Sequence, residues 1–326
     1  MQSRPVDLPR AAVEGGPAPV TALARALIEN LSRVIRGKPE PVRLAAVALL
    51  SGGHLLVEDV PGVGKTLLAK AMARSVGGSF RRIQATPDLL AAELTGVNVF
   101  HAGSARWEFR PGPLFANVVL VDELNRATPR TQSALLEAME EHQISVDGET
   151  HPLPDPFFLV ATQNPYEHAG TFPLVEGQLD RFALVVQLGH PSRLAERELL
   201  LGTGGVPSLD DIGPVCEPRA LSAAMAAVRQ IHCAPAVAEY VVELANATRA
   251  HPQVVIGASP RASLALLHAA RAQAAMASRG FVVPDDVQAL AVPVLAHRLV
   301  LGGGPDLRSG AEVVRGVVSS VPVPRA

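Results

Sequence analysis

Residues 54–66, with the sequence HLLVEDVPGVGKT, constrain the fold most strongly. The apolar residues 54–57 predict a short buried strand, and an apolar helix is expected over residues 65–76. The turn between them is built from Pro61, Gly62 and Gly64. A strand that runs through a glycine-containing turn into a helix is typical of parallel α/β sheets.

This turn has the chemistry of a phosphate-binding loop. Its glycines let backbone N–H groups converge on phosphate oxygens, and the helix N-terminus adds partial positive charge. Lys65 supplies a full charge for the β- and γ-phosphates, and the Thr66 hydroxyl is placed to ligate Mg²⁺. The strict pattern has a glycine where Asp59 stands, so a strand–helix turn with a surface lysine is the alternative.

Composition excludes several classes of protein. The 326 residues are 48% hydrophobic and 18% charged, which indicates a globular chain long enough for two domains. The net charge of -2 argues against nucleic-acid binding through a broad basic surface. No secretion signal is visible, and no apolar run reaches the ~18 residues of a membrane span. The two cysteines, Cys216 and Cys233, suit a reducing cytosol, so we expect a cytoplasmic protein.

Strands and helices alternate through the first half of the chain. Strands are expected at 80–84, 117–122, 157–161 and 182–188, with a helix at 131–141. From residue 192 onward the pattern is helical, with helices expected at 192–201, 220–231, 236–250, 260–278, 285–298 and 311–318. We therefore expect three parts: a flexible lead-in over 1–19, an α/β core over 20–190 and a helical domain over 191–326.

Two hairpins interrupt this alternation. One joins residues 97–100 to 106–109 and carries Trp107, the only tryptophan. The other surrounds Asp147 and Gly148, a strong signal for a type I′ turn. Trp107 either packs the first hairpin against its own domain or contacts a client or partner, and the sequence leaves both alternatives open.

The strand at 117–122 ends in two acids, Asp122 and Glu123. Ligands of parallel sheets lie at the carboxyl ends of the strands, so both acids are expected near the nucleotide. Asp122 would then hold Mg²⁺, directly or through water, and Glu123 would orient and deprotonate the attacking water. The alternative is a strand that simply meets solvent at its acidic end.

Three further motifs carry polar side chains. Asn164 follows the strand at 157–161 and could contact the γ-phosphate or the water, although Asn-Pro turns are common. Arg181 precedes the last strand, where an exposed Asp–Arg pair is the plain alternative. Arg261 lies in the first turn of a helix, where the helix dipole disfavours a positive charge, so unless it is paired it is expected to face an anion. A capped helix with an exposed Arg261 is the alternative.

Together these motifs resemble the MoxR-type AAA+ ATPases, in the same clade as the ATPase subunit of magnesium chelatase. The resemblance covers roughly residues 20–320, and this family commonly carries Glu-Asp-x-Pro-Gly, so Asp59 fits. It implies a parallel-sheet α/β P-loop core with helix-2 and pre-sensor-1 hairpin inserts, followed by an all-α lid domain.

The resemblance also implies roles for individual residues. Lys65 and Thr66 match Walker A, Asp122 and Glu123 match Walker B, and Asn164 matches sensor 1. Arg181 matches the arginine finger, which acts in trans, Arg261 matches sensor 2, and Arg126 falls where the clade has an interface arginine. The expected metal ligands are Thr66 and Asp122. The expected ATP-binding residues are Asp59, Val60, Pro61, Gly62, Val63, Gly64, Lys65, Thr66 and Leu67, with Ile35, Arg36, Gly37 and Lys38 in the adenine-side segment.

The function expected from this resemblance is chaperone-like remodelling of client proteins, driven by MgATP hydrolysis in a hexameric ring. A partner with a von Willebrand factor A domain is expected beside the client. A chelatase-like motor subunit and a nucleotide-gated scaffold without hydrolysis are the alternatives. The sequence does not identify the client.

Overall fold

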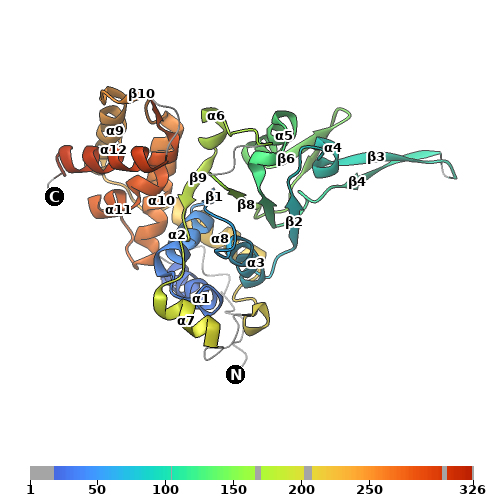
Figure 1. Cartoon of the computed structure of the whole chain (residues 1–326), viewed down its shortest axis with the longest axis horizontal. Helices are drawn as coiled ribbons and strands as arrows, with labels where there is room; N and C mark the ends of the chain where they lie inside the picture. Colours follow the sequence, from blue (N-terminus) through green and yellow to red (C-terminus); the bar gives the residue numbers. More distant parts are fainter. Residues whose placement is uncertain (1–17, 104, 166–169, 202–207, 303–306, 325–326) are drawn as a thin grey trace.

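A parallel five-stranded sheet forms the centre of the molecule in the computed structural model (Figure 1). The structure describes residues 18–324, except 104, 166–169, 202–207 and 303–306. The strand order is β2-β5-β8-β1-β9. The strands are β1 (His54–Glu58), β2 (Phe80–Gln84), β5 (Val118–Asp122), β8 (Phe158–Gln163) and β9 (Phe182–Val186).

Alternate side chains of these strands face two different layers. Leu55 and Val57 of β1 belong to one apolar core, and Leu56 belongs to the other. The first core also contains the helices α1 (Ala18–Val34), α2 (Pro39–Leu50) and α3 (Lys65–Ser75). The second core contains α4 (Ala91–Thr95) and α5 (Pro129–Glu141). Burial on both faces explains why β1, β5, β8 and β9 are largely apolar runs, whereas the edge strand β2, with the sequence FRRIQ, is mostly exposed.

Two antiparallel hairpins extend from this core. The first pairs β3 (Gly96–His101) with β4 (Arg106–Pro111) and projects well beyond the body of the molecule (Figure 1). The second pairs β6 (Gln143–Val146) with β7 (Glu149–Pro152). Its turn has positive φ at both Asp147 and Gly148, as the type I′ prediction requires.

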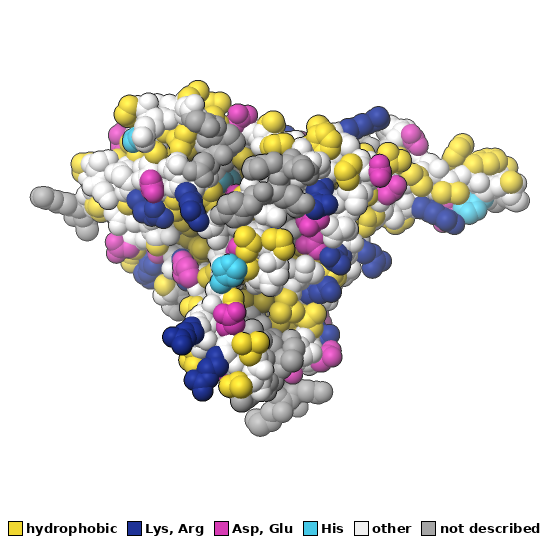
Figure 2. Space-filling model, viewed as in Figure 1, with side chains coloured by type: hydrophobic (Ala, Val, Ile, Leu, Met, Phe, Trp, Pro, Cys, Tyr) yellow, Lys and Arg dark blue, Asp and Glu magenta, His cyan; other side chains and the backbone are white. Residues whose placement is uncertain are grey.

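Trp107 lies on the projecting hairpin with 70% of its surface exposed, and its ring lies 5.2 Å from that of Phe100. Figure 2 shows apolar side chains gathered along this hairpin, with charged groups beside them. The two hairpins are joined by a stacked contact of Phe109 with His151 and a hydrogen bond from Asn98 to Asp147. The idea that Trp107 anchors the hairpin to its own domain is therefore wrong, because its ring packs on the same hairpin.

A helical lid follows the sheet. It contains α8 (Pro218–Arg229), α9 (Pro235–Ala250), α10 (Pro260–Met276), α11 (Pro284–Leu295) and α12 (Leu307–Ser320). Helix α10 begins as expected: the Ser259 side chain accepts a hydrogen bond from the Ala262 backbone N–H at 3.0 Å, and Pro260 occupies the first turn. The lid also carries a short antiparallel pair, β10 (Val254–Ile256) with β11 (Val300–Leu301), which was not predicted.

The remaining elements are short. They are α6 (Glu176–Leu179), α7 (Arg193–Leu201) and the 3₁₀ turns η2 (Leu124–Arg126), η3 (Leu209–Asp211) and η4 (Ala296–Arg298). The helix expected at 285–298 ends earlier than predicted and continues as η4, after Pro293 inside α11.

The N-terminal helices tie the lid to the core. Helix α1 packs against α3 of the core and α10 of the lid, so one apolar cluster runs through both parts. The Thr21 hydroxyl of α1 donates a buried hydrogen bond of 2.6 Å to the Ala275 carbonyl of α10. The expected lead-in falls mainly in residues 1–17, outside the described residues, and residues 18–19 already belong to α1. The boundary near residue 190 stays a prediction.

Candidate functional site: the carboxyl edge of the sheet

Three predicted site segments meet at the carboxyl edge of the sheet. The loop at 59–64 follows β1, Asp122 ends β5 with Glu123 directly after it, and Asn164 follows β8. Register places Gln84 of β2 beside Asp122, and Glu58 of β1 beside Gln163 of β8. Parallel strands bring the ends of distant segments together in this way, which is the reason the sequence motifs converge.

The loop after β1 has the backbone that its glycines require. Gly62 and Gly64 have φ of 85° and 100°, values that L side chains rarely adopt. Gly64 precedes α3, so Lys65 and Thr66 form its first turn. The Lys65 ammonium donates to the backbone carbonyl of Asp59 at 2.5 Å and, more weakly, to that of Gln163 at 3.3 Å. Burial lowers the pKa of Lys65, and nearby acids oppose that shift, Asp59 foremost.

Asp59 has a structural role that the sequence did not reveal. Its backbone is not in the left-handed region, so glycine is not required there. Its carboxylate accepts hydrogen bonds from the backbone N–H groups of Val60 at 2.8 Å and Gly189 at 2.6 Å. Lys38 holds the same 188–190 turn, donating to the carbonyls of Leu188 and Gly189 at 2.7 Å and to that of His190. The segment expected on the adenine side and the predicted phosphate loop are therefore joined through one turn.

The two predicted metal ligands lie together. The Thr66 hydroxyl is 3.2 Å from Asp122 Oδ2 and 3.4 Å from Oδ1. Asp122 is buried, and it also accepts hydrogen bonds from the Thr162 hydroxyl at 3.2 Å and from Arg82 Nε at 2.7 Å. A hydroxyl and a carboxylate are hard oxygen ligands of the type that Mg²⁺ prefers, and the carboxylate already attracts a cationic group. These residues therefore fit a Mg²⁺ ion.

Glu123 is held in an unusual conformation. Its φ of 57° and ψ of 47° are left-handed, which non-glycine residues adopt rarely and often at functional sites. Its backbone N–H donates to the Thr162 hydroxyl at 2.9 Å. Its carboxylate accepts from Gln84 at 2.8 Å and lies 3.2 Å from Arg126 Nε. Arg126, expected at a subunit interface, contacts the predicted base within its own chain.

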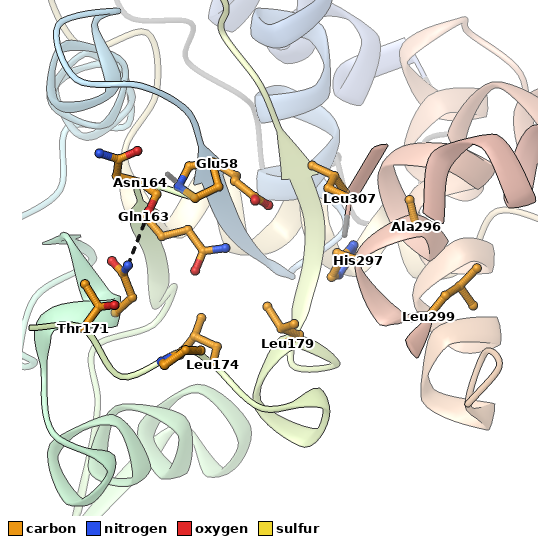
Figure 3. Close-up of a pocket in the computed structure, with 13 residues that line it drawn as sticks. Glu58, Gln163, Asn164, Thr171, Leu174, Leu179, Ala296, His297, Leu299 and Leu307 are labelled. Atoms are coloured by element: carbon orange, nitrogen blue, oxygen red, sulfur yellow. Dashed lines mark hydrogen bonds between the residues drawn. The ribbon is translucent and has the colours of Figure 1, made fainter. Parts of the chain in front are cut away.

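Asn164 lies at the rim of a cavity of about 280 Å³ between the sheet and the lid (Figure 3). Its backbone carbonyl accepts a hydrogen bond of 3.5 Å from Asn125. Glu58 and Gln163 contribute from the strand ends, and His297 contributes from the lid. The sensor 1 candidate therefore lies where the predicted nucleotide site meets the lid.

The candidates for the arginine finger and sensor 2, Arg181 and Arg261, do not lie at the carboxyl edge of the sheet. Arg181 directly precedes β9, and Phe182 is in register with His54, the first residue of β1. Arg181 is therefore at the amino edge of the sheet, and the phosphate loop follows the opposite end of β1. Both Arg181, at 2.9 Å, and Arg261 form ion pairs with Glu140 of α5. The structure brings these arginines to each other and separates them from the loop of their own chain.

Asp180 also has a structural role that the sequence did not reveal. Its carboxylate pairs with Arg298 at 2.9 Å and accepts a hydrogen bond of 2.9 Å from the Ser259 hydroxyl. Only 2% of the Arg298 side chain is exposed, and it also donates to the carbonyls of Phe182 and Ala183. The alternative of an exposed Asp180–Arg181 pair is therefore wrong, because Asp180 pairs with Arg298 and Arg181 pairs with Glu140. Asp180 instead joins the last strand to the lid helix that carries Arg261.

Arg82, Gln84 and Thr162 were also not predicted as part of the site. Each donates a hydrogen bond to Asp122 or Glu123, and 39 or 40 residues of sequence separate it from that partner. Arg82 and Gln84 are two apart on β2 and so share a face, which is the one signal available in the sequence. Two polar residues on one face of a strand beside Asp122 and Glu123 are a pattern from which their part in the site could have been predicted.

Fold and site define a class of protein: a P-loop nucleotide-binding core with a helical lid. Family models agree. Residues 54–184 match the ATPase family associated with various cellular activities (AAA), and residues 246–316 match the AAA lid domain. A crystal structure of a candidate ATPase from Cytophaga hutchinsonii superimposes with a TM-score of 0.84 at 29% identity, covering 95% of this chain and 97% of that one.

Three similar proteins show to which family of this class the chain belongs. YeaC, an uncharacterized protein of Bacillus subtilis, is 44% identical over 91% of this chain and 93% of its own. Chaperone MoxR1 of Mycobacterium tuberculosis is 42% identical over 90% and 80%, and MoxR of Paracoccus denitrificans is 30% identical over 91% and 95%. The chain belongs to the MoxR family of AAA ATPases. In the part of the chain that the structure describes, no helix is both long and apolar enough to span a membrane.

Proposed function

We propose that this protein is a cytoplasmic ATPase that hydrolyses MgATP at the subunit interfaces of a ring, which is expected to be hexameric. Hydrolysis would drive chaperone-like remodelling, activation or cofactor insertion of client proteins. The observation that carries the proposal is the meeting of Lys65, Thr66, Asp122 and Glu123 at one edge of the sheet. Membership of the AAA family supports nucleotide binding.

Each residue has a specific role in this proposal. The loop of residues 59–67 binds the phosphates, Lys65 neutralises the β- and γ-phosphates, and the segment 35–37 faces the adenine side. Thr66 and Asp122 would hold Mg²⁺, which would supply charge stabilisation for the phosphates. Glu123 orients the attacking water and accepts its proton, and Asn164 contacts the water or the γ-phosphate.

The positions of the arginines support assembly. Arg181 and Arg261 lie at the amino edge of the sheet, and the phosphate loop lies beyond the carboxyl end. Strand β1 has five residues, so about 13 Å of strand separates the two ends. An arginine at that distance would serve the nucleotide of an adjacent subunit, where such a residue is typically worth ~10³–10⁵ in rate.

ATP binding and phosphate release test this proposal. Glu123→Gln should bind ATP and lose about 10²-fold or more in kcat, because the base is removed while the phosphate loop is intact. Lys65→Ala should lose binding of a fluorescent ATP analogue. The matched controls are Glu137→Gln on α5 and Lys70→Ala on α3, which should behave as the wild type. Near-normal turnover by both Glu123→Gln and Lys65→Ala would refute the assignment.

Two alternatives share part of this site. A chelatase-like motor subunit would use the same ATP chemistry for metal insertion into a tetrapyrrole, and its partners would distinguish it. A scaffold without hydrolysis would bind ATP and release no phosphate. Capture of partners with Glu123→Gln as a trap, together with the phosphate-release assay on the wild type, separates these cases.

The projecting hairpin is the part of the molecule that we assign to client or partner contact, with an A-domain protein as the expected partner. Its exposed Trp107 and Phe100 form an apolar surface far from the main core. Trp107→Ala should keep basal ATPase activity and assembly and weaken stimulation by the partner. Phe281→Ala, which alters an exposed aromatic residue of the lid, is the control. Unchanged coupling in Trp107→Ala would exclude this role.

A further inference from the structure

Arg82 contacts the buried carboxylate that the proposed function assigns to the metal. Its Nε lies 2.7 Å from Asp122 Oδ2, and the Thr66 hydroxyl lies 3.2 Å from the same oxygen. The side chain of Asp122 is 8% exposed, and that of Arg82 is 47% exposed. One end of this ion pair is therefore fixed in the core, and the other end has free access to solvent.

The guanidinium is also held from its other side. Its Nη2 donates to the side-chain oxygen of Gln84 at 3.2 Å, and Gln84 in turn donates to Glu123 at 2.8 Å. Arg82 and Gln84 share one face of β2, which lies directly beside β5. The planar fork of an arginine can make both contacts at once, which an ammonium group cannot do with the same geometry.

We propose that Arg82 competes with Mg²⁺ for Asp122 and so sets the metal affinity of the site. This inference rests on the proposed MgATP site and adds a positioning residue to it. Mg²⁺ demands near-octahedral geometry with oxygens at about 2.0–2.1 Å, so an ion held by Thr66 and Asp122 needs the space around Oδ2. A guanidinium hydrogen-bonded to that oxygen repels a divalent cation.

The exposure of Arg82 makes the exchange feasible. When its guanidinium turns toward solvent, Asp122 keeps its hydrogen bond from Thr162 and its carboxylate stays in place. The cost of the exchange is the loss of one half-exposed ion pair and of the exposed hydrogen bond to Gln84, and such contacts contribute modestly because solvent screens them or replaces them. Removing Arg82 should therefore raise metal affinity about fivefold, without creating or destroying a ligand.

The test is a titration of Mn²⁺ into the full-length protein saturated with a non-hydrolysable ATP analogue, followed by electron paramagnetic resonance. Arg82→Met keeps the length of the side chain and removes its charge, so Mn²⁺ should bind about fivefold more tightly than to the wild type. Arg81→Met is the matched control, because Arg81 is exposed on the same strand and makes no ion pair with a carboxylate among the described residues. It should bind Mn²⁺ as the wild type does.

Unchanged or weaker binding to Arg82→Met would overturn the inference; weaker binding would mean that Arg82 orients Asp122 for the metal. Asp122→Asn separates this result from failure of the proposed function. If Mn²⁺ binds Asp122→Asn as well as it binds the wild type, the metal site itself is wrong and the inference falls with it. If Arg82→Met does not fold, Arg82→Gln in the same titration should also bind more tightly, and equal binding would contradict the competition.

Discussion

Replacing Asp180 should lower the free energy of unfolding far more than replacing the acid of an exposed ion pair elsewhere in the molecule. Arg298 is buried, and its partner Asp180 is its only carboxylate among the described residues. Burial lowers the pKa of Arg298 to about 10, against the opposing charge of Asp180. Asp180→Ala leaves this guanidinium buried without a counter-charge, and breaking a buried pair in this way costs about 3–5 kcal/mol.

The matched control is the pair between Arg74 and Asp210, whose nitrogen and oxygen are 3.5 Å apart and whose carboxylate side chain is 89% exposed. Asp210→Ala should cost less than about 1 kcal/mol. The free energy of unfolding is measured by urea titration at pH 7 with far-ultraviolet circular dichroism. Equal losses in Asp180→Ala and Asp210→Ala would refute the argument.

A double variant tests the physical cause. Asp180→Ala combined with Arg298→Met removes both charges and fills the space with an apolar chain of similar length. Replacing a buried ion pair by apolar groups is often neutral, so the double variant should regain most of the stability lost in Asp180→Ala. If it is less stable than Asp180→Ala, the loss comes from the missing hydrogen bonds of Arg298 and not from its unpaired charge.

Two further predictions concern a buried histidine and a shared carboxylate. Burial lowers the pKa of His54 from 6.5 to about 4, so between these pH values only the unfolded chain binds a proton at this histidine. The contribution of neutral His54 to the free energy of unfolding is therefore complete above pH 6.5. About 3 kcal/mol of that free energy should be lost as the pH falls to 4. His54→Gln should flatten this part of a urea-stability profile, and an unchanged slope would contradict it. Glu140→Ala should lower kcat of the assembled ATPase about tenfold, at unchanged KM, because Glu140 holds Arg181 and Arg261 side by side. The neighbouring Glu141→Ala is the control, and wild-type kcat in Glu140→Ala would show that the arginines need no such anchor.

The sequence predicts well what depends on local pattern. Gly62 and Gly64 are needed for their backbone angles, and the apolar strand before Asp122 is long enough to be recognised. Because parallel strands end at the same edge, the order of the motifs also predicts that Asp122 and Asn164 approach the loop. The α/β core, its two hairpins and the helical lid were all predicted correctly.

What the sequence misses depends on contacts between distant segments. Arg298 is 118 residues from Asp180, and Arg261 is 121 residues from Glu140, so no periodicity connects them. The strand pair β10–β11 escaped because one of its strands has only two residues, which is too short for alternation to be visible. The tertiary fold alone decides which charges are paired.

Completion of the site by a neighbouring subunit can be tested by mixing two inactive variants. Arg181→Ala has an intact phosphate loop and lacks the arginine, and Lys65→Ala has the arginine and lacks ATP binding. Neither variant alone should release phosphate at an appreciable rate. Mixed assemblies, verified by size and composition, should recover a substantial fraction of wild-type activity, because the Arg181 of one subunit reaches the nucleotide of the next. Mixed assemblies that form and stay inactive would contradict the claim.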